Sequence, residues 1–232
     1  MLALVHSPLT GPFVWQLAEQ ELSRRGVEAV VPEVAEHPSS DRPYWEQEAN
    51  SAARSLRAIE DPIVLVAHSG AGALLPPIRE RLPVSVSGYL FVDAVIPEDG
   101  KTRLEMISED AKEWAAELRR HLEQGGRFPE WEDDELRDVI PNSGIRRGLI
   151  EDLRPRPLRF FTEPIPAFDG WPDAPCGYVR LSPPYDPLLE EAGKRGWPRA
   201  ALDAGHFHML VDPPAVVDAM LGLLEAMSVR PS

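Results

Sequence analysis

Residues 62–75 read PIVLVAHSGAGALL and join a short apolar run to a turn of small residues and then to a second apolar segment. Residues 63–66 form an unbroken and largely β-branched block, which is typical of a strand buried on both faces of a parallel sheet. The turn at residues 67–71 follows at once, and a helix is expected after it. This stretch therefore predicts an interior strand that ends in a tight strand-to-helix turn.

The turn places small residues, Ala67 and Ala71, two positions before and two positions after Ser69. This is the spacing of a nucleophile elbow, in which the strand reverses so tightly that only small side chains clear the backbone. Glycine is usual at both flanking positions, and alanine occupies both here. Such a turn lifts the hydroxyl of Ser69 out of the sheet and directs N–H groups of the next helix toward any oxyanion formed there. On its own, the pattern also suits an ordinary turn with Ser69 as the helix N-cap.

The rest of the chain supplies five more strands that alternate with helices. Strands are expected at residues 2–5, 27–31, 86–92, 177–181 and 199–202. Helices are expected at residues 13–25, 41–59, 73–82 and 188–195, and after Asp212. Pro76 and Pro77 must kink the third of these helices or split it in two. The alternation predicts an α/β fold with a mostly parallel six-stranded sheet and helices on both faces.

The alternation stops between residues 97 and 166. Apolar residues recur every three or four positions at 104–122, which predicts one amphipathic helix, and shorter helices are expected at 132–139 and 143–153. The acidic run at 130–135 is interpreted as a solvated face. A helical insertion between two strands can exclude water from a site at the strand ends. We therefore predict a helical lid at residues 97–166 on a core of residues 1–96 and 167–232.

Composition limits the partners that are expected. The 232 residues suit one domain with an insertion, and the net charge of -14 disfavours nucleic acid and anionic membranes, because phosphates would be repelled. Cys176 is the only cysteine, so an intramolecular disulfide is excluded, and this thiol is interpreted as structural because no base stands near it in sequence. No signal peptide or membrane-spanning run is recognisable, so a cytoplasmic location is expected.

Three side chains with catalytic chemistry follow the ends of predicted strands. Ser69 follows the third strand, Asp186 the fifth and His206 the sixth, and the carboxyl ends of parallel strands face one crevice. Asp93, just past the fourth strand, is the alternative acid. His208 could pair with His206 in a metal site, but no third ligand has a recognisable spacing, so no metal is expected.

The chain order of serine, acid and histidine is the one associated with this elbow, and over almost its full length the chain resembles the α/β-hydrolase superfamily. The similarity is greatest to the small lidded branch of esterases, methylesterases and hydroxynitrile lyases. Two further motifs of that branch carry the resemblance. The N-terminal HGxxxGxxxW is represented by His6, Ser7, Gly11 and Trp15, and the C-terminal GHxxM…P by Gly205, His206, Met209 and Pro213.

The resemblance implies that Ser69 is the nucleophile and His206 the general base and then acid. Asp186 is expected to orient the imidazole, and it is preferred over Asp93 because it lies in a loop near the histidine motif. The neighbouring histidines, His6 and His68, are interpreted as residues that brace the loops of the site.

The expected oxyanion hole departs from the pattern of these relatives. In them, the second donor is the backbone N–H two residues after the loop histidine, where this chain has Pro8, which lacks an N–H. Gly70 is expected to supply the first N–H and Leu9 to replace the second, unless the hole is only half built. The loss of one donor typically lowers the rate about 10² to 10³-fold.

The function expected from this resemblance is a cofactor-independent serine hydrolase that cleaves a small-molecule carboxylic ester or thioester through an acyl-enzyme. One alternative is a lyase or cyclase on the same scaffold, in which His206 moves a proton and Ser69 only positions the substrate. Another is a catalytically silent member that binds a ligand.

Overall fold

A computed structural model of the chain describes residues 1–37 and 40–230, and its centre is a six-stranded sheet in the order β2-β1-β3-β4-β5-β6. The strands are β1 (Leu2–Val5), β2 (Ala29–Val30), β3 (Ile63–Ser69), β4 (Val86–Ala94), β5 (Cys176–Arg180) and β6 (Arg199–Ala201). All five pairings between neighbouring strands are parallel. The predicted fold class is confirmed, and each predicted strand overlaps an observed one.

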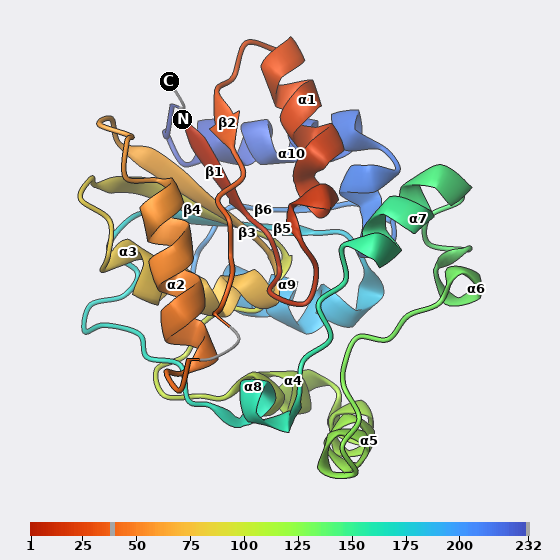
Figure 1. Cartoon of the computed structure of the whole chain (residues 1–232). Helices are drawn as coiled ribbons and strands as arrows, with labels where there is room; N and C mark the ends of the chain where they lie inside the picture. The colour runs from red at the N-terminus through yellow and green to blue at the C-terminus, as the bar shows by residue number, and fades with distance from the viewer. Residues whose placement is uncertain (38–39, 231–232) are drawn as a thin grey trace.

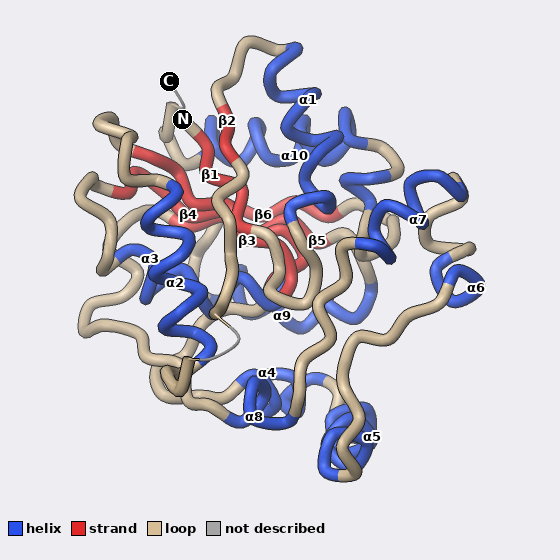
Figure 2. Tube along the Cα trace, in the orientation of Figure 1, coloured by secondary structure: helices blue, strands red, loops and turns tan. Residues whose placement is uncertain are grey.

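Helices cover both faces of this sheet, which forms the middle layer in Figures 1 and 2. Successive residues of a strand point to opposite faces, so Leu4 packs with one layer and Val5 with the other. One layer contains α1 (Gln16–Arg24) and α10 (Pro213–Ala226), and the other contains α2 (Tyr44–Ser55), α3 (Leu75–Arg79) and α9 (Asp186–Lys194). Every strand in the interior of the sheet is therefore buried on both sides.

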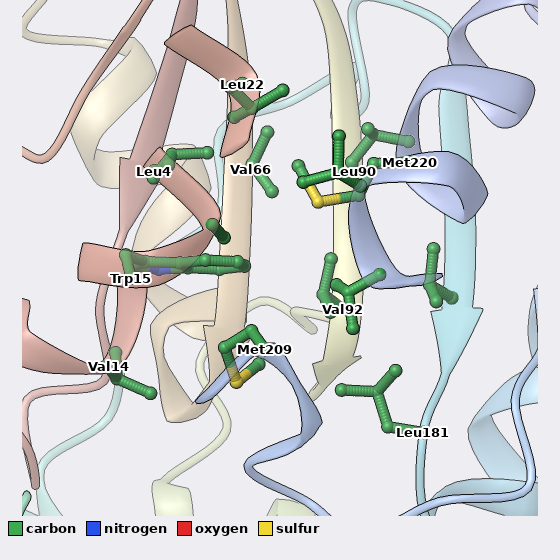
Figure 3. Packing of buried hydrophobic residues seen from close by; sticks show 14 of the residues in the cluster. Leu4, Val14, Trp15, Leu22, Val66, Leu90, Val92, Leu181, Met209 and Met220 are labelled. Carbon is green, nitrogen blue, oxygen red and sulfur yellow. The ribbon is translucent and has the colours of Figure 1, made fainter. Parts of the chain in front are cut away.

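The layer that contains α1 and α10 holds the side chain of Trp15, which is fully buried beside Leu4 and Val66 (Figure 3). Met209 packs into the same cluster, so two residues of the sequence motifs, Trp15 and Met209, fill the core beside the site loops. Asp212 caps α10 by accepting a hydrogen bond from the N–H of Ala215 at 3.1 Å, in agreement with the predicted start of this helix.

The helix after the serine turn is divided, as the two prolines predict. A short 3-10 helix, η2 (Gly70–Leu74), precedes α3, in which Pro76 and Pro77 occupy the first turn, where their missing N–H groups leave no intrahelical bond unmade.

Five helices lie between β4 and β5: α4 (Arg103–Asp110), α5 (Lys112–Glu123), α6 (Asp133–Leu136), α7 (Ser143–Glu151) and α8 (Leu158–Thr162). The prediction of one helix over residues 104–122 is wrong. Ala111 has φ −143° and ψ 65°, which breaks the backbone between α4 and α5 although the apolar spacing continues across it. Helix α8 was not predicted.

The insertion packs against the loops of the core. A separate apolar cluster joins α4, α5 and α8 and includes Leu9, from the loop after β1. A second link is ionic, since Arg103 Nη2 lies 2.7 Å from Glu48 Oε2 of α2, with both side chains buried. The division into core and lid at residues 97 and 166 stays a prediction.

No helix in the described part of the chain is long and apolar enough to cross a membrane. The cytoplasmic location stays a prediction.

Candidate active site

Ser69 ends strand β3 with a backbone conformation that side chains rarely adopt. Its φ is 59° and its ψ −131°, and the register between β3 and β4 shifts between His68 and Ser69. A positive φ at a residue other than glycine is strained and is concentrated at functional sites. The chain then turns directly into η2, where a side chain at Gly72 would stand 1.9 Å from the carbonyl oxygen of Val95. The local geometry is that of a strained elbow rather than an ordinary N-capped turn, and Ser69 makes no side-chain capping bond to η2.

His206 faces a carboxylate from strand β4. Its Nδ1 lies 2.9 Å from Oδ2 of Asp93, which is fully buried. Because a carboxylate accepts this bond, Nδ1 carries the proton and Nε2 of a neutral imidazole is left as an acceptor. The Asp93–His206 pair therefore presents a base at the same end of the sheet as Ser69.

The carboxylate of Asp93 is fixed by three further donors. The N–H groups of Leu181 and Ser182 donate to Oδ1 at 2.6 and 3.1 Å, and the hydroxyl of Ser182 donates to Oδ2 at 2.5 Å. Asp93 itself has φ 45°, a second strained residue in the site. Four hydrogen bonds satisfy a charge that would otherwise be costly to bury.

Asp186, the preferred acid in the sequence analysis, is not the partner of His206. It is the first residue of α9, its side chain is 51% exposed, and its Oδ1 lies 2.7 Å from Nε of Arg180. The preference for Asp186 over Asp93 is corrected for a physical reason: Asp186 forms an ion pair at the surface, whereas the positive φ of Asp93 accompanies its buried bond to the imidazole.

Tyr185 stacks on His206 and lies near Ser69, although it belongs to no recognisable sequence motif. Its ring stacks on the imidazole of His206 at 5.0 Å between centroids and 8° between planes, and its hydroxyl lies near enough to that of Ser69 for Ser69 to offset part of the rise in the pKa of the phenol. Burial raises the pKa of the phenol, so the group is neutral. Tyr185 thus joins the serine and the histidine in one site. No sequence signal distinguishes this tyrosine from any other loop aromatic.

His68 supports the loop that carries His206, in agreement with the role expected from the sequence. Its Nε2 donates to the carbonyl oxygen of His206 at 3.0 Å, and the two rings lie 4.4 Å apart. Burial lowers the pKa of His68 well below 6.5, so the ring is neutral. Of the two candidate histidines, His206 faces Asp93, while His208 begins the short helix η4 (His208–Leu210).

His6 braces the loop after β1. Its Nδ1 donates to the carbonyl oxygens of Ser7 and Thr10 at 2.9 and 3.0 Å, and its Nε2 accepts from the N–H of Val34 at 3.2 Å. Burial is the main cause that lowers the pKa of this imidazole. Gly11 leaves room in the same loop for the carboxylate of Asp152, which a side chain at this position would overlap.

Leu9 does not offer a free N–H in this loop. Its N–H donates to Oγ of Ser7 at 3.3 Å. The expectation that Leu9 N–H replaces the donor missing at Pro8 is therefore not met in this conformation. The carbonyl oxygen of Pro8 accepts two bonds from the buried guanidinium of Arg156, at 3.1 and 3.0 Å, which holds the loop against the insertion.

The remaining candidate, Cys176, is buried in β5, and burial raises the pKa of its thiol to about 12. It stays a thiol at neutral pH, which agrees with a structural role. In residues 1–37 and 40–230, no cluster of histidine, cysteine or acidic side chains is arranged to hold a metal ion.

The insertion reaches both sides of the site. On one side, Trp131 of the insertion lies edge-on to Phe207, the residue that follows His206, with 5.7 Å between the ring centroids. Val139 of the insertion is also close, because a side chain at Gly205 would stand 3.0 Å from it. On the other side, Leu9 of the loop after β1 packs against the apolar cluster of the insertion, and Arg156 of the insertion donates to the carbonyl oxygen of Pro8 in the same loop.

The fold and the site together define an α/β-hydrolase. A profile described as the alpha/beta hydrolase family matches residues 2–219, and the chain belongs to this family. A search of curated proteins gave no match.

Solved structures share the fold over nearly the whole chain. An extracellular alpha/beta-hydrolase from a Paenibacillus species, described as homologous to tobacco salicylic acid binding protein 2, has a TM-score of 0.75 at 16% identity, with 96% of this chain and 98% of that chain covered. Tomato methylketone synthase I has a TM-score of 0.73 at 11% identity, with 97% and 98% covered. A pyrethroid hydrolase from Sphingobium faniae has a TM-score of 0.68 at 18% identity, with 97% of each chain covered. At these identities the likeness extends to the fold alone.

Proposed function

We propose that this chain is a serine hydrolase that cleaves a small-molecule carboxylic ester or thioester through an acyl-enzyme on Ser69. The observation that carries the proposal is the buried Asp93–His206 pair, which leaves Nε2 of the imidazole as an acceptor at the same site as a serine with a strained elbow conformation. The esterase and hydrolase structures that share the fold support the same class of reaction.

In the proposed reaction, Oγ of Ser69 attacks the carbonyl carbon while its proton passes to Nε2 of His206. The tetrahedral intermediate carries a negative oxygen that the N–H of Gly70 faces. His206 then protonates the leaving alcohol or thiol as the carbon–oxygen or carbon–sulfur bond breaks, and the acyl group stays on Ser69. Water, deprotonated by His206, then attacks the acyl-enzyme. The bond between the acyl carbon and Oγ of Ser69 breaks, His206 returns the proton to Oγ, and the carboxylic acid leaves. Asp93 stabilises the imidazolium in both halves of the cycle.

The insertion is proposed to act as the lid of this site. The insertion contacts Phe207, which is next to His206, and Leu9, in the loop after β1. It can therefore cover the bound substrate and exclude water. The substrate is proposed to be neither a nucleic acid nor a membrane lipid surface, because the chain carries a net charge of -14.

An active-site fluorophosphonate tests the proposal. The wild-type protein should gain the mass of one phosphonyl group at Ser69 and hydrolyse members of a panel of esters and thioesters, while Ser69→Ala should do neither. Ser51→Ala is the matched control, because Ser51 is a buried serine in α2, outside the site. A folded wild-type protein that is not labelled and hydrolyses no member of the panel would refute the hydrolase.

The phenol of Tyr185, which stacks on His206 and lies near the hydroxyl of Ser69, favours a second candidate function. A serine hydroxyl held by a phenol can position a substrate while His206 transfers a proton, as a lyase or cyclase requires. A screen that adds cyanohydrins to the esters and thioesters separates the two. Turnover that survives Ser69→Ala but not His206→Ala would favour the non-hydrolytic enzyme. Saturable stabilisation by a ligand without turnover would favour the silent binding protein.

A further inference from the structure

Ser7 places a hydroxyl beside the backbone of Gly70. Its side chain is 2% exposed, and Oγ lies 3.7 Å from the point at which a Cβ of Gly70 would stand. Gly70 follows the nucleophile and supplies the first N–H of the proposed oxyanion hole. Two donors that bind one oxygen must lie within a few ångströms of each other, and the 3.7 Å from Oγ to the Cβ position of Gly70 places the hydroxyl beside the residue that carries the first donor.

The hydrogen bond that Ser7 makes leaves its own proton available. Oγ accepts the N–H of Leu9 at 3.3 Å, and a hydroxyl that accepts a bond can still donate one. Within residues 1–37 and 40–230, no protein acceptor takes that proton. The hydroxyl is therefore a buried donor without a partner, next to the nucleophile turn.

The loop that carries Ser7 is held at three consecutive points. The carbonyl oxygen of Ser7 accepts from His6, that of Pro8 accepts two bonds from Arg156, and that of Leu9 accepts from the N–H of Arg154 at 2.9 Å. Donors fixed before the reaction stabilise a developing charge without paying for reorganisation at that moment.

We propose that the hydroxyl of Ser7 is the second donor of the oxyanion hole, in place of the N–H that Pro8 lacks. It donates to the carbonyl oxygen of an ester or thioester as that oxygen becomes negative, while Leu9 N–H orients Oγ and Gly70 N–H supplies the other bond. This assignment rests on the proposed hydrolase function. It also gives a chemical role to the serine that replaces glycine in the loop motif.

Ser7→Ala tests the assignment, with Ser51→Ala as the control for loss of a buried serine hydroxyl outside the site. Steady-state kinetics on the best ester of the panel should show kcat lowered about 10² to 10³-fold and KM changed by less than about threefold, because the bond forms mainly in the transition state. Affinity for a trifluoromethyl ketone, which forms a tetrahedral adduct with Ser69, should fall in parallel with kcat/KM. Affinity for a planar amide analogue of the ester should not fall. Thermal melting should show that the variant is folded.

Other outcomes overturn the assignment in distinguishable ways. If the wild type is active and Ser7→Ala stays within about threefold of it in kcat, Ser7 is not the second donor. If Ser7→Ala lowers the affinity for the planar amide as much as for the ketone, Ser7 shapes the pocket and does not serve the oxyanion. If the wild type is folded but is neither labelled nor active, the hydrolase itself fails and the assignment fails with it.

Discussion

Asp93 and His206 are 113 residues apart in sequence, yet Oδ2 of the aspartate accepts a hydrogen bond from Nδ1 of the imidazole at 2.9 Å. The bond fixes the tautomer of His206 and leaves Nε2 as the acceptor. Because Leu181 and Ser182 also donate to Asp93, the end of β5 sets the direction of the carboxylate. The orientation of the base therefore depends on three neighbouring segments of the sheet.

Asp93→Asn should separate the two acids that the sequence offered. An amide of the same shape cannot stabilise the imidazolium and favours the wrong tautomer, so kcat for ester hydrolysis should fall about 10³ to 10⁴-fold. Asp186→Asn is the matched control, and it should stay within about threefold of the wild type because it loses only a surface ion pair. A large loss in Asp186→Asn with little change in Asp93→Asn would contradict the pairing.

Tyr185→Phe should remove the phenol hydroxyl that lies near the hydroxyl of Ser69 while the ring still stacks on His206. A hydrogen bond between neutral groups is worth about 1 kcal/mol net, so fluorophosphonate labelling of Ser69 should become faster by up to about fivefold. Tyr89→Phe is the control, because its hydroxyl bonds to Asp173, outside the site, at 2.5 Å. Labelling slowed tenfold or more in Tyr185→Phe would instead mean that the phenol assists the attack by Ser69.

Arg103→Met should destabilise the fold by leaving the buried carboxylate of Glu48 without its partner. The cost of breaking such a pair is about 3–5 kcal/mol, measured as the free energy of unfolding in urea. The double variant Arg103→Met with Glu48→Met should recover most of the loss, because no buried charge remains. Burial raises the pKa of Glu48, so the deficit of the single variant should shrink as the pH falls and the carboxyl takes up a proton. A single variant as stable as the wild type would show that the ion pair does not hold α4 to α2.

Much of the fold follows from local patterns. Side chains of the block at residues 63–66 point alternately to the two faces of the sheet, so that Leu65 packs in one helical layer and Val66 in the other. Because both faces are buried, an unbroken apolar run predicts an interior strand. The capping residue Asp212 and the paired prolines at 76 and 77 act through the backbone of their own helices, which is why these boundaries could be predicted. The break at Ala111 could not, because alanine favours helix and the apolar spacing runs through it.

The site could be predicted less completely, because its details depend on tertiary contacts. Ser69 and His206 stand in recognisable motifs, and the structure stacks Tyr185 on His206, near the hydroxyl of Ser69. The choice between Asp93 and Asp186 had no local signal, since both follow strands and only the folded chain shows which faces the imidazole. Tyr185 was missed for the same reason.

His68 and His6 should make stability depend on pH below about pH 7. Burial is the main cause that lowers the pKa of both below 6.5, so between the folded and unfolded pKa values the unfolded chain binds more protons. The stabilisation that the two neutral histidines give to the fold is therefore fully present above the pKa of histidine in the unfolded chain. It is lost as the pH falls below 6.5, and the free energy of unfolding decreases by up to about 1.4 kcal/mol per pH unit for each histidine.

Urea unfolding of the wild type from about pH 5 to about pH 8 measures this slope. In His68→Gln, the amide can still donate to the carbonyl of His206. The pH dependence of the free energy of unfolding should therefore decrease only by the part that His68 contributes. His121→Gln, on the exposed side of α5, gives the change caused by losing a surface histidine. Equal slopes in the wild type and His68→Gln would mean that His68 is not held neutral beside the loop that carries His206.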